Sequence, residues 1–162
     1  MKKILIGIAI VLVIVVGAAG FAMLHRPDIP YAELDKKYGY PADETKLIDL
    51  GDGLMAHVRV TGDANGPDVV LIHGYTASVH TWDALTDRLK GEYRVIAVDL
   101  PGHGLARTPN GYKGTIEGFA DYVDAVMGKL GVARATVVGS SMGGHTAWQL
   151  ALRHPGRVEG LV

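Results

Sequence analysis

A serine within a glycine turn is the residue of this 162-residue chain best suited to do chemistry. Ser141 occupies the centre of a Gly-x-Ser-x-Gly pattern, between β-branched Val137-Val138 and a helix-like run from His145 to Arg153. This strand–turn–helix context is typical of a nucleophile elbow, in which a strained serine stands clear of the backbone. Gly139 and Gly143 would remove the Cβ atoms that collide where strand and helix close. An ordinary glycine turn is the alternative interpretation.

A helix that starts near Met142 would direct backbone N–H groups and the positive end of its dipole toward an anion formed at Ser141. The composition excludes other kinds of site. The chain has 16 Lys and Arg against 17 Asp and Glu, so we expect no nucleic-acid partner. It has no cysteine, which excludes a thiol nucleophile, a thiolate metal site and a disulfide framework. We expect neither a cofactor nor a metal ion.

The N-terminal residues 1–24 predict a transmembrane anchor or an uncleaved signal. Ile4 to Leu24 contains no charged residue and would span about 30 Å as a helix, the thickness of a bilayer core. Lys2 and Lys3 outweigh Arg26 on the other flank, which favours a cytoplasmic N-terminus and a periplasmic or extracellular domain. The alternative is a secreted protein, because Gly20-Phe21-Ala22 offers a cleavage site.

Strands and helices alternate in the rest of the chain. Residues 25–45 read as a tether with a helical turn around Ala32–Lys37, and 46–162 as one domain. The expected strands are Lys46–Leu50 and Met55–Val60, joined as a hairpin, then Val69–Ile72, Tyr93–Val98, Ala135–Val138 and Val158–Val162. Helices are expected around Trp82–Leu89, at Ile116–Leu130 and after Ser141. This order predicts an α/β fold, a doubly wound, mostly parallel sheet with helices on both faces.

Two further loops follow predicted strands and complete a recognisable set of motifs. His73-Gly74-Tyr75-Thr76 follows Val69–Ile72, and Asp99-Leu100-Pro101-Gly102-His103-Gly104 follows Tyr93–Val98. With the Gly-x-Ser-x-Gly turn, these loops stand in the order found in the α/β-hydrolase superfamily. From about Lys46 to Val162 the chain resembles the N-terminal portion of a serine esterase or lipase of that superfamily.

The resemblance implies roles for individual residues. Ser141 would be the nucleophile, and the backbone N–H groups of Met142 and Tyr75 would form the oxyanion hole. Gly139, Gly143, His73 and Gly74 would support the elbow and the loop. It further implies that His73, Asp99 and His103 shape loops rather than take part in the reaction.

The resemblance also implies a catalytic acid and a histidine after the nucleophile, in that order. Only His145, His154 and Glu159 follow Ser141 that could serve, and both histidines are better explained as helix-surface residues. We therefore expect the acid and the base to be missing from this chain, which would be the N-terminal part of a longer hydrolase.

The predicted function is a membrane-anchored serine hydrolase that acts on a small-molecule ester or a lipid. The alternatives are a non-catalytic relative that serves as a binding or scaffold protein, and a carbon–carbon bond hydrolase or haloperoxidase of the same fold. Dehalogenases and epoxide hydrolases of the family use aspartate at the nucleophile position, so Ser141 argues against them.

Overall fold

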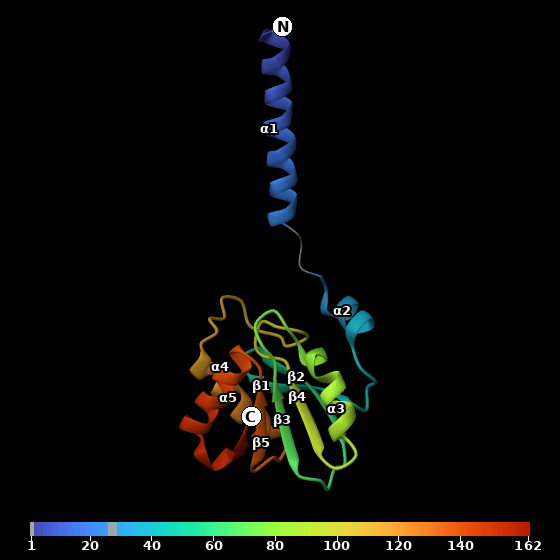
Figure 1. The fold of residues 1–162 in the computed structure, drawn as a ribbon, viewed down its shortest axis with the longest axis vertical. Coiled ribbons are helices and arrows are strands. Elements are labelled where there is room, and N and C mark those ends of the chain that lie inside the picture. Colours follow the sequence, from blue (N-terminus) through green and yellow to red (C-terminus); the bar gives the residue numbers. More distant parts are fainter. Residues whose placement is uncertain (1, 26–28) are drawn as a thin grey trace. The chain divides into compact units, whose positions relative to one another are not determined.

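The computed structural model describes residues 2–25 and 29–162, and the chain divides into two compact units, Met1–Glu33 and Leu34–Val162. In the first unit, α1 runs from Lys2 to Leu24 (Figure 1). Its stretch from Ile6 to Leu24 is long and apolar enough to cross a membrane, and a signal sequence would meet the same criteria. Arg26, on which the predicted charge asymmetry partly depends, lies outside the described residues.

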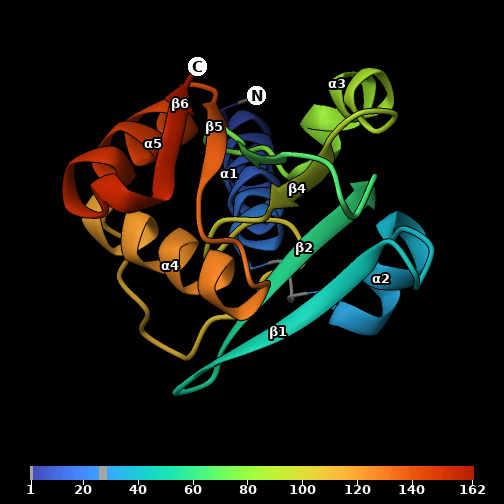
Figure 2. The ribbon, with the colours of Figure 1, turned by 90° about the horizontal axis from the view of Figure 1, so that it is seen from below.

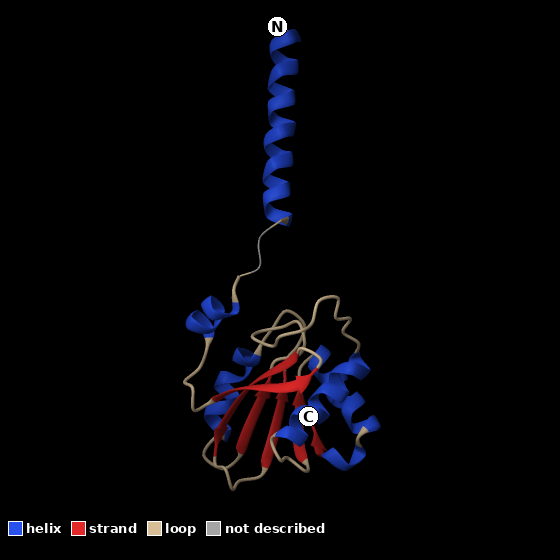
Figure 3. Ribbon diagram, turned by 180° about the vertical axis from the view of Figure 1, so that it is seen from behind, coloured by secondary structure: helices blue, strands red, loops and turns tan. Residues whose placement is uncertain are grey.

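The second unit is built on a six-stranded sheet whose strand order is β1-β2-β4-β3-β5-β6. The strands are β1 (Thr45–Gly51), β2 (Leu54–Gly62), β3 (Asp68–Ile72), β4 (Arg94–Val98), β5 (Ala135–Gly139) and β6 (Val158–Leu161). β1 and β2 form the predicted antiparallel hairpin, and β2 is also antiparallel to β4. The pairs β3–β4, β3–β5 and β5–β6 are parallel, so the sheet is mostly parallel (Figure 3).

Helices cover both faces of this sheet. α4 (Ile116–Lys129) and α5 (Met142–Arg153) lie on one side, and α3 (Asp83–Leu89) lies on the other (Figure 2). Two 3₁₀ turns, η1 (Val79–Trp82) and η2 (Pro155–Arg157), precede α3 and β6. The predicted fold class is confirmed for this domain.

Side-chain alternation along the strands separates the two layers of the core. Val70 and Ile72 of β3 pack in a cluster with residues of α4 and α5. Val69 and Leu71, one position away, pack in a second cluster with Leu85 on the side of α3. A strand covered on both faces must be apolar at every position, which explains its continuous hydrophobic sequence.

The segment expected to be a tether contains α2 (Tyr31–Tyr38), and Tyr40, just beyond this helix, packs against the core cluster on the α3 side of the sheet. The Arg59 guanidinium lies 4.1 Å from the centre of the Tyr40 ring, and its Nη1 donates to Asp83 at 2.8 Å. The Tyr40 hydroxyl donates to the same carboxylate at 2.5 Å. Burial, followed by this hydrogen bond, raises the pKa of Tyr40. The cation–π contact with Arg59 and the hydrogen bond to Asp83 hold Tyr40 against β2 and α3.

The topology brings the three motif loops to one edge of the sheet. The His-Gly loop follows β3, the Asp99 loop follows β4, and the serine turn follows β5. These strands are parallel and β3 lies between the other two. Carboxyl ends of parallel strands meet at one edge, where α/β sheets bind their ligands.

Candidate active site

Ser141 has a backbone conformation that few non-glycine residues adopt. It links β5 to α5 with φ of 53° and ψ of −115°, and it is exposed to solvent. A conformation of this kind costs about 1–3 kcal/mol and persists only where the surroundings enforce it. The strained turn presents Ser141 to solvent at the start of a helix.

The enforcing contact is made by the first turn of α5 against the end of β3. A Cβ atom added to Gly143 would lie 2.0 Å from the Ile72 carbonyl oxygen. A Cβ atom added to Gly139 would lie 2.4 Å from the Gly143 carbonyl oxygen. The Ser140 N–H donates to the Ile72 carbonyl at 3.1 Å, which fixes the turn from its other side. Both glycines of the pattern are therefore required by close backbone approach.

The His-Gly loop lies directly beside Ser141. A Cβ atom added to Gly74 would lie 3.4 Å from Ser141 Cβ and 3.2 Å from the Ser140 carbonyl oxygen. Within the described part of the chain, the N–H groups of Tyr75 and Met142 have no hydrogen-bond acceptor. The Tyr75 side chain is 72% exposed, so it does not fill this space. Free backbone donors beside an exposed serine are suited to an oxyanion.

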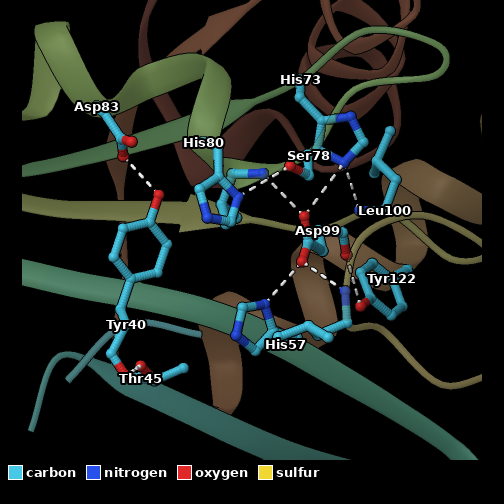
Figure 4. A network of polar contacts seen from close by, with 12 residues as sticks. Tyr40, Thr45, His57, His73, Ser78, His80, Asp83, Asp99, Leu100 and Tyr122 are labelled. Carbon is cyan, nitrogen blue, oxygen red and sulfur yellow. Dashed lines mark hydrogen bonds and ion pairs between the residues drawn. The ribbon is translucent and has the colours of Figure 1, made fainter. Parts of the chain in front are cut away.

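Asp99 joins the loops that surround the site (Figure 4). Its buried carboxylate accepts from the Val79 N–H at 2.8 Å and the Leu105 N–H at 2.9 Å. His57 Nδ1 donates to Asp99 Oδ2 at 2.7 Å. Gly104, at φ of 53°, passes so close that a Cβ atom would lie 2.1 Å from this oxygen. Asp99 is thus a structural centre that ties its own loop to β2 and η1.

His73 connects the His-Gly loop to the Asp99 loop. The ring is fully buried, with Nδ1 2.7 Å from the Gly74 carbonyl oxygen and Nε2 3.0 Å from the Leu100 amide nitrogen. The Leu100 N–H needs an acceptor, so Nε2 is unprotonated and Nδ1 carries the proton that Gly74 accepts. Burial lowers the pKa of His73, in agreement with this neutral form.

The other histidines of the described residues have partners or neighbours other than Ser141. The ring of His145 packs against Trp148, with centroids 6.0 Å apart, and His154 Nε2 lies 2.8 Å from Asp121 Oδ1. His103 lies closer to the site, with its ring 5.8 Å from the Tyr75 ring. Among the described residues, no histidine hydrogen-bonds the Ser141 hydroxyl, and no group of three or more His, Asp or Glu side chains could hold a metal ion.

Two members of this network were missed in the sequence. His57 lies in β2 and pairs with Asp99 across 42 positions, and the Tyr122 hydroxyl of α4 donates to the Asp99 carbonyl at 2.9 Å. His57 could have been found in the sequence, because it is a polar residue between Ala56 and Val58 in an apolar strand. Tyr122 gave no signal because a tyrosine on a largely apolar helix face looks like ordinary core.

A cavity of about 510 Å³ opens beside the Asp99 loop, and Ser141 does not line it. Its walls come from α2, η1 and the Asp99 loop: Leu34, Tyr38, Ser78, His80, Asp99, Gly104 and Leu105. Ser141 itself is exposed to solvent.

Gly143→Ala should destabilise the domain by at least about 2 kcal/mol, because the methyl group would overlap the Ile72 carbonyl. Urea unfolding measures the effect. Gly91→Ala is the control, since a Cβ atom there meets nothing within 4 Å, and should change stability by less than about 0.5 kcal/mol. Equal stability of the two variants would contradict the close approach.

The free energy of unfolding should fall in acid, in part because His73 is held neutral in the folded domain. Burial holds the pKa of folded His73 below the ordinary histidine value of 6.5, so below that pH the unfolded chain binds more protons and folding weakens as the pH falls. The stability advantage of the wild type over His73→Asn should shrink by at most about 1.4 kcal/mol per pH unit below that point. Urea unfolding over this acid range checks it, and a difference independent of pH would refute it.

Comparison with known proteins places this geometry in a family. The sequence model of the alpha/beta hydrolase fold matches residues 67–162. The chain is similar to the pimeloyl-[acyl-carrier protein] methyl ester esterase of Nitrosomonas europaea, with 34% identity over 108 residues that cover 67% of this chain and 40% of the relative. It is also similar to a fluoroacetate dehalogenase of a Burkholderia species, with 31% identity over 71% of this chain and 38% of the relative.

A solved structure of a membrane phospholipase A, a bacterial virulence factor, has a TM-score of 0.67 and 29% identity, and the match covers 98% of this chain and 50% of that one. The chain spans about 40% of the length of the first curated relatives it matches. The family match, the mostly parallel sheet and the three motif loops at its edge agree. The chain belongs to the α/β-hydrolase fold family.

Proposed function

We propose that the protein is a membrane-anchored serine hydrolase that cleaves carboxylic esters, with Ser141 as the nucleophile. The observation that carries this proposal is the strained, exposed Ser141 beside two free backbone N–H groups. The serine oxygen would attack the ester carbonyl carbon, and the N–H groups of Tyr75 and Met142 would stabilise the oxyanion. One donor of this kind contributes about 3 kcal/mol to catalysis. The alcohol would then leave, and water would hydrolyse the acyl-enzyme.

The choice of ester substrates follows from the chemistry of serine. The relatives include an esterase and a dehalogenase, so similarity does not select between them. A serine that attacked an alkyl halide would form an ether, which has no carbonyl for water to attack. A serine that attacks an ester forms another ester, and water can release it. Ser141 therefore favours acyl transfer.

The general base for this reaction is expected outside these 162 residues. A serine hydroxyl needs an adjacent base, and that base needs an orienting carboxylate. His145 and His154 contact other partners, as described above, and His73 uses both ring nitrogens within the loops. The greater length of the relatives is consistent with a base and an acid supplied elsewhere.

The anchoring part of the proposal rests on α1 and on the phospholipase. The apolar side chains of α1 are exposed within their unit, and the likeness to the membrane phospholipase extends over most of α1. Lys2 and Lys3 favour a cytoplasmic N-terminus, with the domain in the periplasm or outside the cell. A membrane-bound esterase would meet lipids or their fragments as substrates.

In the intact protein, a fluorophosphonate probe should label Ser141, and Ser141→Ala should abolish labelling and lower ester turnover by at least about 10³-fold. Ser140→Ala is the matched control, because the neighbouring hydroxyl is not placed in the reaction, and it should retain substantial activity. Mass spectrometry of the labelled peptide and p-nitrophenyl ester hydrolysis measure the two effects. Activity in the Ser141 variant combined with loss in the Ser140 variant would overturn the assignment.

The protein should remain in the membrane fraction after high-salt and alkaline washes, because α1 would be held by burial in the bilayer rather than by charge. Protease added outside the cytoplasmic membrane should digest the domain. Recovery of a soluble form that begins near Met23 would show cleavage after Ala22 and refute the anchor.

A further inference from the structure

We propose that His73 is a positioning residue that orients the Tyr75 N–H toward the oxyanion through the peptide bond between Gly74 and Tyr75. This inference rests on the proposed function, since it explains how one of the two proposed donors is aimed. His73 makes no contact with the reacting atoms in this role. It acts on the backbone that does.

The planarity of the peptide unit couples the two groups of the Gly74–Tyr75 bond. The Gly74 carbonyl and the Tyr75 N–H belong to one rigid trans peptide, so they point in opposite directions. A side chain that holds the carbonyl on one side therefore sets the direction of the N–H on the other. His73 Nδ1 makes this contact at 2.7 Å, inside the buried part of the loop.

The second bond to this carbonyl is longer. The Ala77 N–H donates to the Gly74 oxygen at 3.3 Å, as part of a turn in which Thr76 has φ of 58°. The His73 bond at 2.7 Å is the closer of the two and comes from a fully buried ring. It is the contact that best fixes the rotation of the peptide plane.

The ring of His73 is itself held in one orientation. Its Nε2 accepts from the Leu100 N–H at 3.0 Å, whereas Asp99 Oδ1 lies 3.7 Å away, too far for a hydrogen bond. Only the neutral ring with its proton on Nδ1 satisfies both Leu100 and Gly74. The Asp99 loop thus orients the imidazole, and the imidazole orients the peptide beside Ser141.

Two substitutions separate the contacts of the ring. His73→Asn places an amide nitrogen near Nδ1 and keeps a donor for Gly74, whereas His73→Gln places an amide oxygen near Nε2 and keeps an acceptor for Leu100. In the intact protein, His73→Gln should lower kcat for ester hydrolysis by about 10- to 100-fold with KM changed by less than about threefold, because the donor is needed mainly in the transition state. His73→Asn should lose less than about fivefold in kcat.

A purely structural role predicts a different result. It would lower kcat of the two variants in parallel with their loss of thermal stability, and that outcome would overturn the proposal. A larger loss in His73→Asn than in His73→Gln would overturn it as well.

A second measurement does not depend on activity. Labelling glycine carbonyls with ¹³C and tyrosine nitrogens with ¹⁵N selects Gly-Tyr peptide bonds, which in this sequence are the pairs 39–40, 74–75 and 111–112. Tyr75→Phe assigns the signal of the pair 74–75. This signal should move in His73→Gln and stay near its wild-type position in His73→Asn, while the other two remain fixed. An unmoved 74–75 signal in His73→Gln would refute the inference.

The proposed function and the role of His73 can be refuted separately. Absence of Ser141-dependent hydrolysis in the wild type would refute the proposed function, and the labelling experiment would still decide the orientation of the peptide. If neither variant folds, the ¹⁵N shifts of the wild-type imidazole decide, since a proton on Nε2 or on both nitrogens would refute the proposed hydrogen bonds.

Discussion

The close approach of α5 to the end of β3 is the constraint on which the candidate site depends. The helix begins so near the Ile72 carbonyl that position 143 has no room for a side chain. The chain must therefore turn within two residues of leaving β5, and Ser141 takes up the strain at φ of 53°. The elbow is stable because the strand and helix on either side of it are packed in the core.

A buried polar network organises the loops beside this turn. Asp99 accepts hydrogen bonds from two backbone amides and from His57, and His73 spans the gap to the His-Gly loop. Polar groups removed from water are costly unless they are paired, and most of these are paired. His57 Nε2 is an exception, since it is buried without a partner among the described residues. The network gives loops without regular secondary structure one defined arrangement.

Local pattern was sufficient to predict the elements but not their contacts. The apolar runs at Val69–Ile72 and Tyr93–Val98 identified buried strands, and the glycines around Ser141 identified the turn. The position of β3 between β4 and β5 is a property of the whole sheet and has no signal in the strand itself. The pairing of His57 with Asp99 depends on that order, as β2 and β4 must first become neighbours. Packing of Tyr40 was missed because a polar, proline-rich segment carries no periodic signal.

The two proposed oxyanion donors are backbone groups, so they do not depend on the side chains that would contact the substrate. Every residue type except proline supplies a backbone N–H at positions 75 and 142, and Tyr75 is largely exposed. Mutation at position 75 can therefore alter the surface a substrate meets while leaving the electrostatics at the carbonyl oxygen intact. Substrate preference could therefore change by substitution at position 75 during evolution, while the N–H that stabilises the oxyanion is retained.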